Sequence, residues 1–111
     1  MEVKIIRTET LAKIRDVIPV GKQNAIPCKD IQVAFGFETP RDVKRAIALL
    51  RDSGEPICAD LSSTGGYFIP ETVDEAQEYL SIKRKQLKSE QRALEPVIKF
   101  CRYNGAGGED R

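Results

Sequence analysis

The stretch that decides the fold runs from residue 29 to residue 69 and has the sequence KDIQVAFGFETPRDVKRAIALLRDSGEPICADLSSTGGYFI. Up to Leu50, apolar residues recur every three or four positions, which is typical of helices with one buried face. Beyond Gly54, two apolar, β-prone segments flank a run rich in Ser and Gly, which is typical of a hairpin. The stretch therefore predicts two helices joined by a tight turn and followed by a small β-hairpin.

The second helix of this pair has clear start and stop signals, and we expect it over residues 40–53. Thr39 can accept hydrogen bonds from the backbone of the first turn. Pro40 fits the first helical position, because its missing N–H would have no partner there. Asp42, three residues after Thr39, occupies the capping-box position. Gly54 follows as a residue that can end the helix with a positive φ.

The two faces of this helix differ in chemistry. One is made by Val43, Ala46, Ile47 and Leu50, and the opposite one by Arg41, Lys44, Arg45 and Ala48. The first face predicts burial in a core. The second can enter a DNA major groove, because Arg and Lys reach phosphates or guanine edges and Ala permits close approach. The alternative is a solvated face without a binding role, which is common on amphipathic helices.

A shorter helix is expected over residues 29–35, with Cys28 at its N-cap position. Its buried residues, together with the turn that follows, are expected to be Ile31, Ala34, Phe35 and Phe37. The small side chain of Ala34 would let the two helices cross closely, and Gly36 can take a positive φ in the turn. This spacing is that of a helix-turn-helix.

The hairpin is expected to have strands over residues 57–59 and 67–69, joined by a turn over residues 60–66. Gly65 and Gly66 raise the alternative of a phosphate-binding loop. A P-loop, however, needs a following Lys-Ser/Thr at a fixed spacing, which this segment lacks. We therefore interpret the segment as a hairpin turn.

A third helix is expected near the N-terminus. Thr8 or Thr10 can cap it, and Pro19 and Gly21 can end it. Its expected buried residues are Leu11, Ile14, Val17 and Ile18. An edge strand of two or three residues is then expected at residues 25–26, ahead of the helix pair.

The C-terminal third predicts a long helix from Glu71 or Thr72 to about Arg92, broken or kinked near Leu94 by Pro96. Every seventh residue is apolar, namely Val73, Leu80, Leu87, Leu94 and Cys101. Because the companion heptad positions are half polar, the seam is weak. Two interpretations stay open: the helix pairs with a second copy through residues 80–101, or it docks on its own domain.

Length and composition are those of one globular domain. The chain has 111 residues, a net charge of +1, three cysteines and no histidine. Residues 55–80 carry only acidic charges, whereas residues 81–103 carry seven cations and two acids, so local basic surfaces coexist with a near-neutral sum. No run is apolar enough to cross a membrane, and no signal peptide is evident.

The cysteines favour free thiols in a reducing cytoplasm, because their spacing fits no zinc motif. We expect no metal, no cofactor and no small-molecule substrate. Catalysis is not expected either, since no adjacent base would activate Cys28, Cys58 or Cys101 as a nucleophile.

Several residues resemble those of the winged helix-turn-helix of the biotin-repressor type. The most specific part is LR-x-x-G-x-P-I, from Leu50 to Ile57, followed by GGY at residues 65–67. The resemblance implies a mainly helical α+β fold, in which a three-helix winged helix-turn-helix with a small β-hairpin wing precedes the long C-terminal helix. The expected domains are a winged helix-turn-helix over residues 1–70 and, from the residues themselves, a C-terminal helix over residues 71–103, kinked near Pro96, and a flexible tail over residues 104–111.

The resemblance also implies a function, that of a small bacterial or phage transcriptional regulator that binds double-stranded DNA. The expected major-groove residues are Arg41, Lys44, Arg45 and Ala48. Lys29 and Gln32 are expected to contact the flanking DNA backbone, with Thr39 beside them and Ser62, Ser63 and Thr64 near phosphates. Two departures from the family are an extra turn residue, Glu38, and a wing tip without Arg or Lys. The alternative is a winged-helix module that binds another protein in a phage or replication-related complex.

Overall fold

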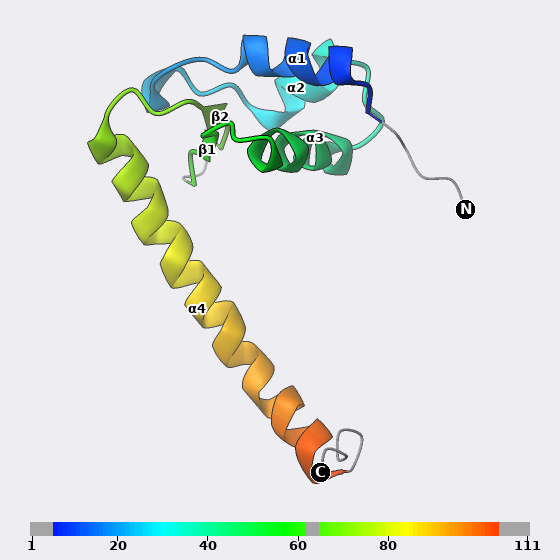
Figure 1. Cartoon of the computed structure of the whole chain (residues 1–111), viewed down its shortest axis with the longest axis vertical. Helices are drawn as coiled ribbons and strands as arrows, with labels where there is room; N and C mark the ends of the chain where they lie inside the picture. Colours follow the sequence, from blue (N-terminus) through cyan, green and yellow to red (C-terminus); the bar gives the residue numbers. More distant parts are fainter. Residues whose placement is uncertain (1–5, 62–64, 105–111) are drawn as a thin grey trace. The chain divides into compact units, whose positions relative to one another are not determined.

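The computed structural model describes residues 6–61 and 65–104, and Figure 1 shows the order of the elements. Within these residues the chain is mainly helical, with four α-helices, a short 3-10 helix and a two-stranded antiparallel hairpin. The elements are α1 (Thr8–Val17), η1 (Lys22–Asn24), α2 (Cys28–Ala34), α3 (Pro40–Asp52), β1 (Cys58–Ala59), β2 (Tyr67–Phe68) and α4 (Val73–Tyr103). The expected α+β class with a long C-terminal helix is confirmed.

Internal contacts divide the chain into two compact units, with the division between Tyr79 and Leu80. The N-terminal unit holds α1, α2, α3, the hairpin and the first seven residues of α4. The remainder of α4 belongs to the second unit.

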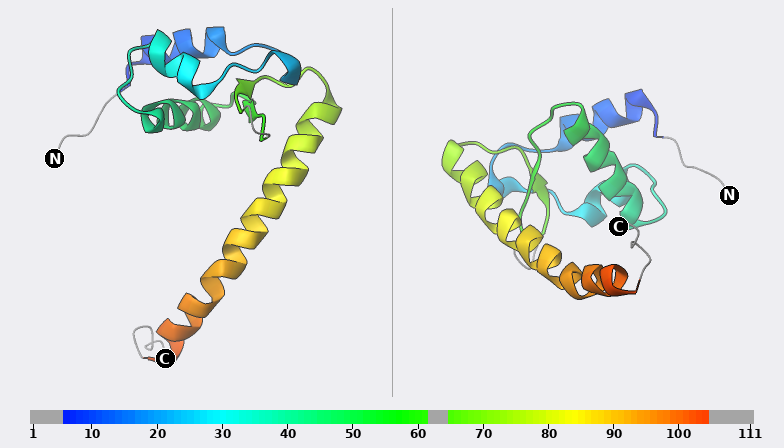
Figure 2. Two further views of the ribbon diagram at one scale, coloured as in Figure 1. Left: turned by 180° about the vertical axis from the view of Figure 1, so that it is seen from behind. Right: turned by 60° about the horizontal axis from the view of Figure 1, so that its bottom comes forward.

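The core of the N-terminal unit lies where α1 and α2 meet α3 (Figure 2). Its buried members are Ile14, Ile18, Ile31, Val43, Ala46, Ile47, Leu50 and Ile57. Phe35 and Phe37 are half-buried and pack against this core with stacked rings whose centroids are 6.4 Å apart. The apolar face predicted for α3 is therefore confirmed in full.

Two residues expected in the core are exposed instead. Val17 is 42% exposed, because Ile18, the next residue, turns inward and adjacent helical positions point about 100° apart. Ala34 is exposed for the same reason, since Ile31 and Phe35 face the core from positions on either side of it. The prediction that Ala34 lies in the helix crossing was wrong.

Two predicted N-caps were also wrong. Thr8 is the first residue of α1 and follows Arg7, whose side chain makes no capping hydrogen bond. Cys28 is likewise the first residue of α2, and the extended residue before it is Pro27. The Pro27 carbonyl accepts hydrogen bonds from Asp30 and Ile31, so the backbone closes this first turn without a side-chain cap.

The hairpin pairs Cys58 with Phe68 and Ala59 with Tyr67, so each strand is shorter than predicted. The expected edge segment at residues 25–26 is present as a bridge, in which Ile26 and Tyr67 exchange backbone hydrogen bonds of 2.8 and 2.9 Å. Gly66 has φ +116°, and a Cβ there would lie 3.1 Å from the Ile26 carbonyl oxygen. A glycine is therefore required where the two backbones approach.

Helix α4 begins as predicted but ends later. The Thr72 hydroxyl accepts a hydrogen bond of 3.2 Å from the Glu75 N–H and so caps the first turn. The helix then continues through Pro96 to Tyr103, so the predicted break near Leu94 was wrong. Proline removes one backbone donor at this point, while the hydrogen-bonding turns on both sides remain helical. No residue of α4 is buried.

Among the residues that the structure describes, no helix has the length and apolarity that crossing a membrane requires. The same residues contain no group of three or more His, Cys, Asp and Glu side chains that is able to hold a metal ion.

Candidate nucleic-acid interface

Helix α3 presents the candidate interface, because one of its faces is buried in the core and the opposite face, here called the open face, is exposed to solvent. Ile47 is 1% exposed and Val43 is fully buried. The opposite face exposes Arg41, Lys44, Arg45 and Ala48. Helix α3 therefore exposes three cations around one small side chain to solvent.

A capping box fixes the first turn of α3. The Thr39 N–H donates a hydrogen bond of 3.3 Å to Asp42 Oδ2, and the Asp42 N–H donates in return to the Thr39 side chain. Asp42 is only 8% exposed. The sequence predicted this cap correctly, and its consequence is that Thr39 orients the turn that carries Arg41.

The turn between α2 and α3 is held by Gln32. Its side-chain Nε2 donates a hydrogen bond of 3.2 Å to the Glu38 carbonyl oxygen. The backbone carbonyl oxygen of Gln32 accepts a hydrogen bond of 2.9 Å from the Phe37 N–H. Gly36 adopts φ +69°, as predicted. Gln32 therefore helps to hold the turn that positions α3, and its predicted contact with the DNA backbone stays a prediction.

The start of α2 lies beside the start of α3. Cys28 Sγ approaches the Pro40 carbonyl oxygen at 3.9 Å. Burial raises the pKa of the Cys28 thiol, and the positive charge of Lys44 opposes this rise. The charge of Lys44 therefore acts on the thiol of Cys28, the first residue of α2. Lys29 follows Cys28 in the chain and, like Lys44, is exposed.

The charge on the open face is positive but not uniformly so. Within the described part of the chain, neither Arg41 nor Lys44 forms a salt bridge. Asp52 lies one turn beyond Ala48 on the same side of α3 and is also exposed. Sequence reasoning missed this acid, although the periodicity that selected Arg41, Arg45 and Ala48 also selects position 52.

Of the predicted interface residues, α3 carries four and α2 carries Lys29 and Gln32. Ser62, Ser63 and Thr64 lie outside the described residues. Among the described residues around them, the Asp60 N–H donates a hydrogen bond of 2.8 Å to the Gly66 carbonyl oxygen.

No family model matches the chain, and no match was found among curated proteins or among solved structures. A function for this chain is therefore inferred from the chemistry and placement of the α3 side chains.

Proposed function

We propose that the N-terminal unit is a winged helix-turn-helix domain that binds double-stranded DNA. In this proposal α2 and α3 form the helix-turn-helix, the hairpin is the wing, and α1 completes a three-helix bundle. The protein would act in the cytoplasm as a small transcriptional regulator of bacterial or phage type.

The observation that carries the proposal is the exposure of Arg41, Lys44 and Arg45 on the side of α3 opposite its buried face. A major groove admits an α-helix and offers guanine acceptors to Arg and phosphates to Lys. Ala48 supports the proposal, because a small side chain between cations lets the helix axis come close to the base edges.

The residues would have different roles. Arg41 and Arg45 would contact base edges, whereas Lys44 and Lys29 would contact phosphates. Gln32 and Thr39 would act by holding the turn and the first turn of α3. The remaining expected contacts, from the turn hydroxyls to phosphates, are those of Ser62, Ser63 and Thr64.

The decisive experiment is a titration of a labelled random-sequence duplex at several low salt concentrations, followed by fluorescence anisotropy. The variant Arg41→Ala/Lys44→Ala/Arg45→Ala should bind more weakly than the wild type. Because Lys44 is the one of these three cations assigned to phosphates, the slope of log affinity against log salt should fall by about 0.9.

A matched control removes three exposed cations from α4 and so changes the net charge equally, as Lys85→Ala/Arg92→Ala/Lys99→Ala. This variant should retain most of the affinity. Equal losses in both variants would indicate binding by overall charge and would contradict the assignment to α3.

A second candidate function is binding to another protein, which two observations favour. The net charge is only +1, and Asp52 lies on the same face of α3 as Arg41 and Arg45. The same titration separates the two functions, because a protein that reads DNA grooves binds random duplex at low salt. Absence of any binding there would support the protein-binding role.

A further inference from the structure

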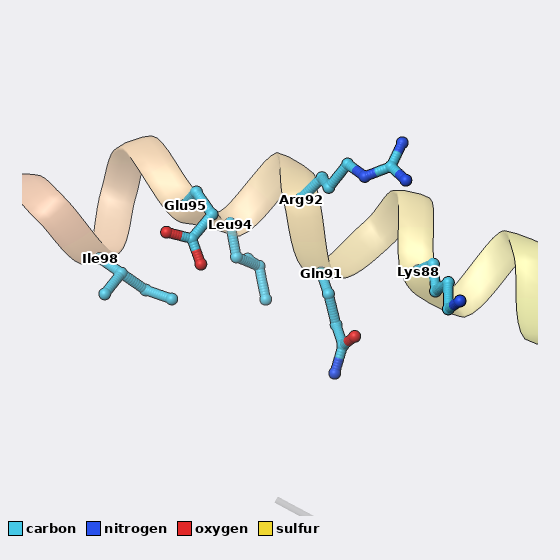
Figure 3. Close-up of a pocket in the computed structure, with 6 residues that line it drawn as sticks. All are labelled: Lys88, Gln91, Arg92, Leu94, Glu95 and Ile98. Carbon is cyan, nitrogen blue, oxygen red and sulfur yellow. The ribbon is translucent and has the colours of Figure 1, made fainter.

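The second unit of the chain exposes an apolar stripe along α4. From Leu80 onward its members are Leu80, Leu87, Leu94, Ile98 and Cys101. Leu94 is 55% exposed, and a shallow hollow runs beside it, bounded by Lys88, Gln91 and Glu95. Figure 3 shows Gln91, Leu94 and Ile98 projecting to one side of the helix and Arg92 to the other.

This helix lacks the means to be stable by itself. No residue of α4 is buried, and isolated helices of ordinary composition are marginal in water. An interior proline weakens such a helix further. Pro96 lies two residues from both Leu94 and Ile98, so its ring projects about 160° away from the stripe and leaves that side free for packing.

We propose that the stripe packs against the same stripe of a second copy of this chain, with the two helices antiparallel. The two-fold axis passes between residues 92 and 93. Leu87 then packs on Ile98 of the second copy, and Gln91 packs on Leu94 of the second copy. Arg84 lies opposite Cys101 of the second copy at the end of the contact.

Charge complementarity selects this orientation and register. In it, Lys88 lies beside Glu95 of the second copy, and symmetry makes this ion pair twice. Parallel helices with the same seam would instead place Lys83 beside Lys88 and Glu90 beside Glu95. A parallel seam that instead uses positions 83 and 90 would bury Lys83 against Lys83 of the second copy and Glu90 against Glu90 of the second copy. Burying like charges against each other costs much free energy.

Dimerisation through α4 does not depend on DNA binding, and its tests use the 111-residue chain alone. Sedimentation over a concentration series should show a monomer–dimer equilibrium for the wild type. Leu94→Asp should abolish the dimer. Phe100→Asp is the matched control, because Phe100 is 66% exposed on the opposite side of the same helix, and it should leave the dimer unchanged.

Charge reversal tests the orientation. Lys88→Glu and Glu95→Lys should each raise the dimer dissociation constant about tenfold, and the double variant should restore it. In a parallel dimer each single reversal would relieve a repulsion and strengthen the dimer. In Lys88→Glu the new carboxylate gains partners within the helix in Arg84 and Arg92, so loss of helix does not explain a weaker dimer of this variant.

Cross-linking tests the register. In the variant Arg84→Cys, a short bismaleimide should link position 84 to Cys101 of the second copy, as peptide mapping would show. Links between the two Cys101 residues would establish the parallel orientation and overturn the proposal. A wild-type chain that stays monomeric up to about 1 mM would overturn it as well, because the dimer would then be too weak to be specific.

Discussion

Arg51 Nε donates a hydrogen bond of 2.9 Å to the carbonyl oxygen of Ile57, and this bond joins the end of α3 to the residue just before β1. The same guanidinium donates from Nη2 to the Tyr79 hydroxyl at 3.3 Å and lies 6.0 Å from the centre of the Tyr79 ring. Arg51 therefore connects elements of the N-terminal unit through its side chain.

We expect Arg51→Ala to lower the free energy of unfolding by about 1–2 kcal/mol, because two hydrogen bonds from a charged group are lost. Urea denaturation followed by circular dichroism measures this change. Arg41→Ala removes an equal charge from the open face of α3 and should leave the stability within about 0.5 kcal/mol of the wild type. Equal destabilisation by both variants would contradict the division of roles.

Arg45→Ala and Lys44→Ala should affect DNA binding differently. If Arg45 bonds a guanine through two donors, its loss should weaken binding to a selected site by about 1–3 kcal/mol and relax the preference at one base pair. Lys44→Ala should weaken selected and random duplexes alike and reduce the salt slope by about 0.9. Competition titrations with both duplexes measure these effects, and wild-type affinity of the Arg45 variant would exclude its assigned role.

Asp52→Asn should strengthen binding to random duplex at low salt by a few-fold, because the carboxylate on the open face repels phosphates at close range. The gain should disappear as salt screens the interaction. Asp16→Asn is the matched control, since Asp16 is exposed on α1 and the substitution changes the net charge equally. If both variants gain equally in affinity for the duplex, Asp52 acts only through the net charge and its position on the open face has no effect.

The free energy of unfolding of the protein should fall as the pH rises above 9.0. Burial raises the pKa of the Cys58 thiol above its usual value of 9.0, and burial likewise raises the pKa of the Tyr67 hydroxyl above 10.0. In the unfolded chain these groups release their protons first, so folding must take protons up and becomes less favourable with increasing pH. The contribution is complete below pH 9.0 and is lost as pH rises through the folded-state pKa.

Urea denaturation at pH 7.5 and at pH 10, one value below and one above the usual pKa of 9.0, measures this effect. Cys58→Ala should reduce the fall in unfolding free energy between these values. Cys101→Ala, which removes an exposed thiol, should not. An unchanged fall in the Cys58 variant would show that its thiol makes no such contribution.

Short-range patterns in the sequence predicted the features that depend only on residues close together in the chain, such as helix caps and helix faces. The capping pair Thr39 and Asp42 and the three-to-four spacing of Val43, Ile47 and Leu50 predicted α3 and its faces, because caps and periodicity act within one helix. Gly36 was predicted to take its positive φ for the same reason. Pro96 misled the prediction, since a proline weakens a helix locally without necessarily ending it.

The sequence by itself determined which residues make helices and which side of α3 is apolar, since these properties depend on neighbours three or four positions apart. Only the tertiary structure decided what the polar side chains do. Gln32 holds a turn, and Arg51 binds the Ile57 carbonyl and the Tyr79 hydroxyl, because their partners are fixed by how separate elements pack. Val17 and Ala34 are exposed for the same reason, since a core admits only the side chains that face it.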